Sequence, residues 1–353
     1  MNNEEEMSET VQKRVFKSAS ATLALDARSE RQCVEMCASV QRILTLHSGS
    51  LREFLFCLPA LKTLRETFEG AHIGAVVRSG LAPLLESSNL VNEVFIRPEG
   101  GLSSQATLMA KLHAHKSDMA IAFSASRKST LLAWSSGAAI RIGFADASME
   151  ALFTHRVEKN SLAPLDIETC LDLARAAGCA PRCYDYGDIL GIAPPLLRAA
   201  DALLAEYSVP SEFLVIAAQS EARLSREEQA RNLACWLEVS GVLASRRAQV
   251  FIGAKPNKIL LQATRSPDHA LCDLGGKLDP AMLAAICARA QSFVGHAGGN
   301  SHLAAALSTP IVAVCPKNEP RDIHEPRGVL HRTLERDCAP EMIIQSVREL
   351  VGI

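Results

Sequence analysis

The stretch FVGHAGGNSHLAAALSTPIVAVC, residues 293–315, places a polar, glycine-containing turn between two apolar runs. An alanine-rich segment follows the turn, and Pro310 precedes the second run. This order predicts a buried strand, a turn, a helix and a second buried strand. We expect the strands over 292–296 and 311–315 and the helix over 300–307.

The same alternation of short apolar runs and helical segments continues on both sides of this stretch. Further strands are expected at 43–46, 72–77, 94–96, 119–123, 140–144, 213–218 and 249–253. Continuous apolar strands separated by helices are typical of parallel sheets that are covered on both faces. Two successive doubly wound halves predict a bilobal α/β protein, and such sheets bind ligands at the carboxyl ends of their strands.

The length of 353 residues suits two domains of roughly 150 residues each. We predict a polar N-terminal extension over 1–40, an N-terminal Rossmann-like domain over 41–190 and a C-terminal one over 191–353. The boundary lies within a stretch that contains prolines and tyrosines, 181–195, which we interpret as the passage between the domains. The last helix, expected near 339–351, is able to pack back on the N-terminal domain.

Composition narrows the classes of function. A net charge of -2 without a long basic block gives no electrostatic support for a nucleic-acid partner. The 11 cysteines are scattered singly and lack paired CxxC spacing, so we expect reduced thiols and no metal site. No apolar run reaches the ~18 residues of a membrane span, so we expect a cytoplasmic protein.

The glycine-rich turn has two interpretations. Gly298 and Gly299 allow a ligand to approach the backbone, and the amides of the helix start near Asn300 favour an anion such as a diphosphate. His302, in the first helical turn, could then contact a phosphate or a ribose. Alternatively, Asn300 caps the helix and His302 is a packed core histidine. The chain has no GxGxxG after its first strand and no GxxxxGK[ST], which argues against dinucleotide and P-loop sites.

Two stretches, one in each half, resemble one family. "FVGHAGGNSHLAAALSTPIVAVCPKNEP" (293–320) is similar to the C-terminal signature of glycosyltransferase family 9, the ADP-heptose:lipopolysaccharide heptosyltransferases. "RILTLHSGSLREFLFCLPALKTLRETFEGAHIGAVVRSGLAPLLESSNLVNEVF" (42–95) resembles the opening of that family. The resemblance covers about 42–350. It implies a GT-B architecture, with two Rossmann-like doubly wound domains facing across a cleft and the donor held mainly by the C-terminal one.

The resemblance also implies an activity. The expected reaction is inverting transfer of a sugar, heptose from ADP-heptose, to an acceptor of the lipopolysaccharide inner-core type, without a metal or other cofactor. The expected partners are a nucleotide sugar and a lipid-linked or oligosaccharide acceptor, with at most peripheral contact at the inner face of the cytoplasmic membrane.

Individual residues are carried over from the family pattern. Glu53 stands at the position of the proposed general base, although Arg52-Glu53 replaces the family's Gly-Asp. Arg223 stands at the position of a phosphate-binding lysine, and a cation there would stabilise the leaving diphosphate. The expected donor-binding set is Arg223, Ser220, Gly298, Gly299, Asn300 and His302, and the expected acceptor-binding residues are Ser50 and Arg52.

Departures from the family pattern leave other functions open. Ala297-Gly298-Gly299 stands where the family has Asp-Ser-Gly, so a carboxylate and a hydroxyl are missing from the donor turn. A catalytically weakened member that binds a nucleotide sugar or a partner protein is therefore the alternative. A UDP-sugar epimerase, or another enzyme with two Rossmann-like domains, is a third class.

Overall fold

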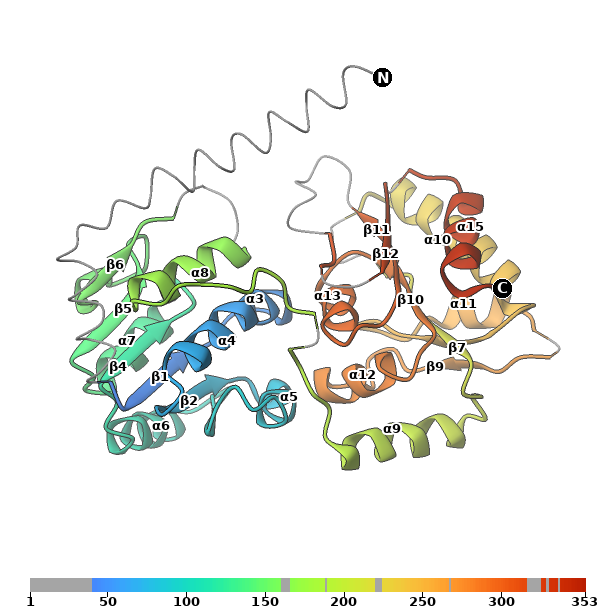
Figure 1. Ribbon diagram of the computed structural model, residues 1–353. Helices are drawn as coiled ribbons and strands as arrows, with labels where there is room; N and C mark the ends of the chain where they lie inside the picture. The colour runs from blue at the N-terminus through green and yellow to red at the C-terminus, as the bar shows by residue number, and fades with distance from the viewer. Residues whose placement is uncertain are drawn as a thin grey trace, which may run out of the picture. The chain divides into compact units, whose positions relative to one another are not determined.

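The structure of the protein is a computed structural model. It describes residues 40–159, 166–187, 189–219, 224–266, 268–315, 325–327, 330–335 and 337–353. Within these residues the chain forms two six-stranded sheets with helices packed on them (Figure 1). The predicted extension over 1–40 lies outside the described residues except for its last residue, and the predicted domain boundary at 190 stays a prediction.

The first sheet has the strand order β3-β2-β1-β4-β5-β6, and all its neighbouring strands pair in parallel. Its strands are β1 (Arg42–Leu46), β2 (His72–Val77), β3 (Glu93–Ile96), β4 (Met119–Ala122), β5 (Ile140–Phe144) and β6 (His155–Val157). The helical segments of this half are α3 (Leu51–Phe56), α4 (Leu58–Thr67), η1 (Ser79–Leu81), α5 (Ala82–Glu86), α6 (Leu102–Ala114), α7 (Arg127–Ser135), η2 (Glu150–Leu152) and α8 (Ile167–Ala176).

Apolar side chains explain why this sheet is covered on both faces. Leu44 and Leu46 of β1 pack with Leu112 of α6 and Leu132 of α7 in one buried cluster. Ile43 and Thr45, which alternate with these leucines along β1, are fully buried as well. A strand with both of its faces buried carries a continuous apolar run, which is the pattern that the sequence shows here.

The second sheet repeats the winding of the first. Its order is β12-β11-β10-β7-β8-β9, again parallel throughout. Its strands are β7 (Phe213–Ala217), β8 (Ala248–Phe251), β9 (Leu271–Asp273), β10 (Ser292–His296), β11 (Ile311–Cys315) and β12 (His331–Glu335). Its helices are α9 (Pro194–Glu206), α10 (Arg226–Ala244), α11 (Lys258–Ala263), α12 (Pro280–Cys287), α13 (Gly299–Ala306) and α15 (Pro340–Val351). Numbered within each half, both sheets have the order 3-2-1-4-5-6 of a Rossmann fold.

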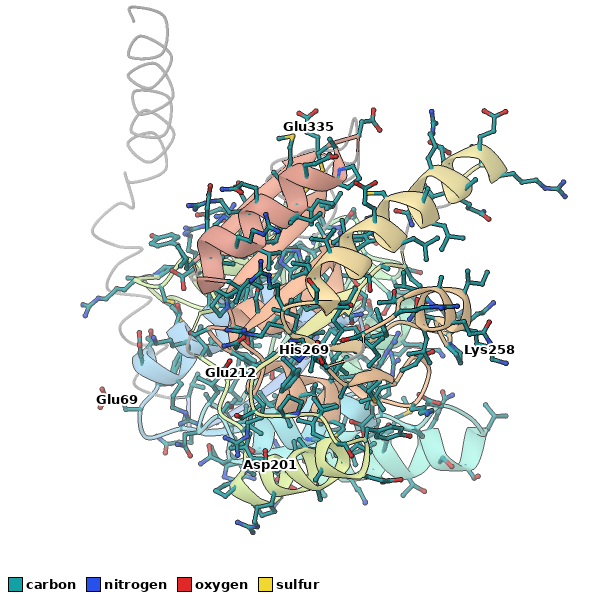
Figure 2. The ribbon with its side chains drawn as sticks, turned by 90° about the vertical axis from the view of Figure 1, so that its right-hand side faces the viewer. Glu69, Asp201, Glu212, Lys258, His269 and Glu335 are labelled. Carbon is teal, nitrogen blue, oxygen red and sulfur yellow. The ribbon has the colours of Figure 1, made fainter. Side chains whose placement is uncertain are left out.

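The final helix belongs to the second half. Ile343 and Val347 of α15 pack in the same buried cluster as Trp236 and Leu243 of α10. The two helices lie side by side (Figure 1, Figure 2). The contacts of α15 thus lie with α10 and the second sheet, and its predicted ability to pack back on the N-terminal domain stays a prediction. Its apolar stripe is covered by α10 and by the second sheet.

Three strands were not expected from the sequence: β6, β9 and β12. Each of the three is the outermost strand at one end of its sheet, where a single neighbouring strand supplies the ladder. β6 and β12 are largely exposed or half-buried along their length. An edge strand of this kind needs no apolar run, so its sequence carries little periodic signal.

Candidate active site

Each sheet has a switch point where its strand order reverses. In the first sheet it lies between β1 and β4, and in the second between β7 and β10. Ligands of such sheets bind outside the carboxyl ends of the strands at this point. The candidate site is therefore expected in the loops that follow these four strands. These loops include the predicted Ser50–Glu53 segment and the Gly298–Asn300 turn.

The first loop ends in a capping box at the start of α3. Ser50 is the N-cap, its Oγ accepting from the Glu53 amide at 3.3 Å, and the Glu53 carboxylate accepts from the Ser50 amide at 2.5 Å. A Cβ on Gly49 would lie 2.5 Å from Glu53 Oε2, so glycine leaves the space for this carboxylate. In the structure Glu53 thus stabilises a helix start, and its predicted role as a base would have to use the same carboxylate.

The second loop is the glycine turn after β10. Gly298 is the N-cap of α13, and the helix begins at Gly299. The Gly298 amide donates to Ser301 Oγ at 3.0 Å, and that hydroxyl donates to the Gly298 carbonyl at 2.9 Å. Asn300 lies within the first helical turn and is not the cap. The Gly298 amide is thus bound to the Ser301 side chain, and the assignment of this turn to the donor stays a prediction.

The structure brings the two predicted loops together. A Cβ on Gly299 would lie 3.5 Å from Leu51 Cβ and 3.6 Å from the Arg52 amide nitrogen. Helices α3 and α13 accordingly pack against each other. The predicted donor turn of the second half thus contacts the helix start that carries Ser50, Arg52 and Glu53.

His302 is packed in the interior of the protein, and its predicted role in donor binding stays a prediction. Its side chain is fully buried, and its Nδ1 is hydrogen-bonded to the Tyr186 hydroxyl. Phe56 of α3 packs edge-on against the His302 ring, with centroids 5.1 Å apart. Burial also raises the pKa of Tyr186. The alternative interpretation, a packed core histidine, describes this residue.

A pocket of about 780 Å³ opens at the carboxyl ends of β7 and β8. It lies between the start of α10 and the loop that leads into α11, and Lys258 of α11 is labelled in Figure 2. Its lining includes Gln219, Leu224, Asn232, Trp236, Asn257 and Lys258. Ser220 and Arg223, two predicted donor-binding residues, lie outside the described residues. In the sequence they stand between Gln219 and Leu224, which both line the pocket.

Sequence reasoning missed a polar network behind this pocket. Asn232 Oδ1 lies 2.7 Å from His296 Nε2 and 3.2 Å from the Trp236 indole nitrogen, and its amide donates to the Ala218 carbonyl at 3.2 Å. Trp236 Nε1 lies 3.1 Å from His296 Nε2. This network ties the ends of β7 and β10 to α10. His296 was visible in the sequence as the last residue of a predicted strand, but only the fold brings it to Asn232.

A second set of missed residues lies at the carboxyl ends of the first sheet. Ser48 Oγ is 3.0 Å from Ser126 Oγ and 2.5 Å from Ser129 Oγ. Arg97, which follows β3, donates to the Ser48 carbonyl at 3.3 Å. Burial and, next, Arg78 lower the pKa of Arg97, whereas Glu99 raises it. Hydroxyl and guanidinium groups suit an anionic ligand.

Comparison with known proteins identifies the family. The model of glycosyltransferase family 9 (heptosyltransferase) matches residues 106–346. The chain belongs to glycosyltransferase family 9. The predicted family and the predicted class of enzyme, a glycosyltransferase, are thereby confirmed. A comparison with curated protein sequences finds no match.

Solved structures of this family have the same fold. The family 9 glycosyl transferase from Veillonella parvula superposes with a TM-score of 0.72 at 16% identity, covering 88% of this chain and 97% of that one. E. coli ADP-heptose lps heptosyltransferase II superposes with a TM-score of 0.72 at 19% identity, covering 88% of this chain and 99% of that one. E. coli heptosyltransferase WaaC with ADP-2-deoxy-2-fluoro heptose superposes with a TM-score of 0.65 at 19% identity, covering 88% of this chain and 99% of that one. The predicted GT-B fold class is confirmed.

Proposed function

We propose that this family 9 member transfers heptose from ADP-heptose to an acceptor of the lipopolysaccharide inner-core type, with inversion and without a metal or other cofactor. The names of the E. coli relatives include ADP-heptose and a heptose analogue. The observation that carries the proposal is the contact of Gly299 with Leu51 and Arg52. This contact supports the proposal because the turn that we assign to the donor packs against the helix start that holds the candidate base.

The donor side of the proposal rests on the pocket beside β7 and β8. Its volume and its mixed apolar and polar lining suit a nucleoside. Arg223, next in sequence to the pocket residue Leu224, is assigned to the diphosphate, which a guanidinium can bind through two parallel hydrogen bonds. Ser220 and the turn at Gly299 and Asn300 are assigned to the same donor.

The acceptor side rests on the first sheet. Ser50 and Arg52 are at the start of α3, and Arg97 and Arg78 lie at the carboxyl ends of neighbouring strands. An inner-core acceptor carries carboxylates and phosphates, and this group of cations and hydroxyls would bind them.

The proposed reaction is a single displacement. Glu53 takes the proton of the acceptor hydroxyl as the acceptor oxygen attacks the anomeric carbon of the sugar. The new glycosidic bond forms as the bond between that carbon and the diphosphate oxygen breaks, so ADP leaves with the negative charge. Arg223 stabilises that charge.

The test measures ADP released from ADP-heptose in the presence of a Kdo-lipid acceptor. Glu53→Gln keeps an acceptor for the Ser50 amide but removes the base, whereas Glu53→Ala removes both. We expect Glu53→Gln to keep the wild-type melting temperature and to lose at least ~100-fold in kcat. Glu66→Gln, an exposed carboxylate of α4, is the control and should keep full activity. Wild-type turnover by Glu53→Gln would show that Glu53 is not the base.

A second candidate function is supported by the capping box. The Glu53 carboxylate already accepts a hydrogen bond from the Ser50 amide, and the donor turn lacks the family's carboxylate and hydroxyl. A member that binds a nucleotide sugar or a partner protein without turnover would have these features. It predicts that ADP-heptose raises the melting temperature while no ADP is released with any inner-core acceptor.

The place of action follows from the acceptor. A lipid-linked acceptor would bring the enzyme to the inner face of the cytoplasmic membrane by peripheral contact. Among the residues that the structure describes, no helix has both the length and the apolar character of a membrane span. Sedimentation with vesicles that contain the acceptor, compared with vesicles that lack it, tests the peripheral contact.

A further inference from the structure

Two histidines and a glutamate lie close together at the amino ends of β2 and β3. The candidate active site lies at the carboxyl ends of the strands. His72 is the first residue of β2, Glu93 is the first residue of β3, and His115 is the C-cap of α6. One ligand atom from each residue lies within 4.8 Å of the other two. Histidine nitrogen with a carboxylate oxygen is a common ligand set for zinc and its neighbours in the first transition row.

Hydrogen bonding leaves both imidazoles available at the same ring position. Nε2 of His72 and Nε2 of His115 are buried and have no hydrogen-bond partner within the described part of the chain. The His115 side chain is 5% exposed. His72 Nε2 lies 3.5 Å from Glu93 Oε2, and the two rings have centroids 5.3 Å apart. Buried polar atoms without a hydrogen bond are rare in proteins, so His115 Nε2 needs an explanation, while His72 Nε2 has the Glu93 carboxylate at ion-pair distance.

A neighbouring serine sets the tautomer of His115. Nδ1 of that ring is 2.7 Å from Ser117 Oγ. When Nδ1–H donates to this hydroxyl, Nε2 carries a lone pair, which is the arrangement that metal-binding histidines adopt. Phe95 packs edge-on against the ring at 5.6 Å and holds its orientation.

The residue beneath the cluster is a glycine. A Cβ on Gly74 would lie 3.0 Å from His115 Nε2. Gly74 is the register partner of Glu93 in the β2–β3 ladder, so any larger residue would crowd the space between the imidazole and the carboxylate. The backbone therefore leaves room at the point toward which the ligand atoms converge.

We propose that His72, Glu93 and His115 bind a divalent transition-metal ion such as Zn²⁺. Tetrahedral zinc with bonds of about 2.0–2.1 Å needs ligand atoms about 3.3 Å apart. The separation of 3.5 Å between His72 and Glu93 is already close to this value. Their side chains are 36% and 46% exposed and can rotate toward the buried His115. Three protein ligands leave a fourth position for water.

Such an ion would join three separate segments of the first half: the start of β2, the start of β3 and the end of α6. Its role is structural or regulatory, because it lies at the edge remote from the loops of the candidate active site. The proposal is independent of the proposed sugar transfer and does not require it.

The experiment titrates chelator-treated protein with Co²⁺ and follows visible d–d absorption, then repeats the titration with Zn²⁺ and follows the melting temperature. The variants are His72→Ala and Glu93→Gln, at partly exposed ligands, and Ser117→Ala, behind His115. His113→Ala, an exposed histidine of the same helix, is the matched control. We expect Co²⁺ affinity to fall at least tenfold in His72→Ala and Glu93→Gln, and about 10–100-fold in Ser117→Ala. The rise in melting temperature with Zn²⁺ should disappear in the first two variants.

Two results would overturn the proposal. One is equal Co²⁺ affinity in the wild type and in His72→Ala and Glu93→Gln. The other is a thiolate-to-cobalt charge-transfer band, which would place the ion on cysteines. Because His72 and Glu93 are partly exposed, unchanged unfolding of their apo variants by urea separates loss of a ligand from loss of the fold.

Discussion

Tyr186 and His302 are joined by a buried hydrogen bond between the phenol oxygen and Nδ1. Tyr186 lies between α8 and α9, in the segment that links the two sheets, and His302 lies in α13 of the second half. The Tyr186 oxygen also accepts from the Arg327 amide at 3.3 Å. Phe56 of the first half packs on both rings, with centroids 6.1 Å from Tyr186 and 5.1 Å from His302. The histidine that the family signature suggests for the donor thus holds the linking segment against α3 and α13.

Tyr186→Phe tests this role. The change keeps the ring and removes the hydroxyl that bonds to His302 and to the Arg327 amide. We expect the free energy of unfolding to fall by about 1–3 kcal/mol, because buried polar groups lose a partner. Tyr184→Phe is the control, since that side chain is 48% exposed and should change stability by less than ~0.5 kcal/mol. Urea unfolding of both variants measures the difference, and equal effects would contradict the assigned role.

Replacing Gly295 and Gly241 by alanine should change the stability of the protein in opposite directions. Gly295 pairs with Ala217 between β10 and β7, and a Cβ on it would lie 2.5 Å from Ala217 Cβ and 2.6 Å from the Ala217 carbonyl oxygen. Gly295→Ala should therefore destabilise the protein by about 1–3 kcal/mol. Gly241 lies inside α10 with nothing within 4 Å of an added Cβ. Gly241→Ala should stabilise by about 0.5–1 kcal/mol. Thermal unfolding measures both changes in stability, and changes of the same sign would contradict the close packing of Gly295 against Ala217.

His47 should make the protein sensitive to acid. Burial lowers the pKa of this histidine from 6.5 to about 3. Between these values the unfolded chain binds a proton that the folded protein excludes, so the free energy of unfolding decreases as the pH falls below 6.5. From about pH 7 to about pH 5 this one group should account for a loss of about 2 kcal/mol.

His47→Phe should remove that loss. A phenyl ring can keep the stacking on Phe123, whose centroid lies 4.9 Å from that of His47, and it cannot bind a proton. Urea unfolding near pH 7 and near pH 5 measures the difference, with the exposed His113→Phe as the control that retains wild-type pH dependence. If the wild type and His47→Phe lost equal stability on acidification, another group would be responsible.

Gln229→Trp should block the pocket that we propose for the nucleotide. Gln229 lines the pocket of about 780 Å³ from the first turns of α10, and an indole there would take the space of a nucleobase. We expect at least tenfold weaker ADP binding by calorimetry. The adjacent Ala230→Trp carries the same bulk at an exposed position outside the lining and should bind ADP normally. Unchanged affinity in Gln229→Trp would place the nucleotide elsewhere.

The central strands were predictable because each is buried on both faces. Val294 and Val312 belong to continuous apolar runs, and both are fully buried in a cluster that includes side chains of α10 and α15. The first residues of the helices were harder to predict. The sequence shows glycines after His296, but whether Gly298 or Asn300 caps α13 depends on the direction of the Ser301 side chain. His302 illustrates the same limit. Its place in the sequence suits a ligand contact, and only the packing of Tyr186 and Phe56 around it shows that it is buried.

The sequence by itself determined two successive doubly wound halves and a family resemblance, because hydrophobic periodicity and short motifs are local properties of the chain. The tertiary structure decided which distant residues meet. Glu53 faces its own helix cap, Gly299 contacts Leu51, and Asn232 reaches His296. His72, Glu93 and His115 converge only because parallel pairing of β2 and β3 brings their first residues to one edge. Local patterns fix each segment's conformation, whereas these contacts depend on strand order and register, which no single segment encodes.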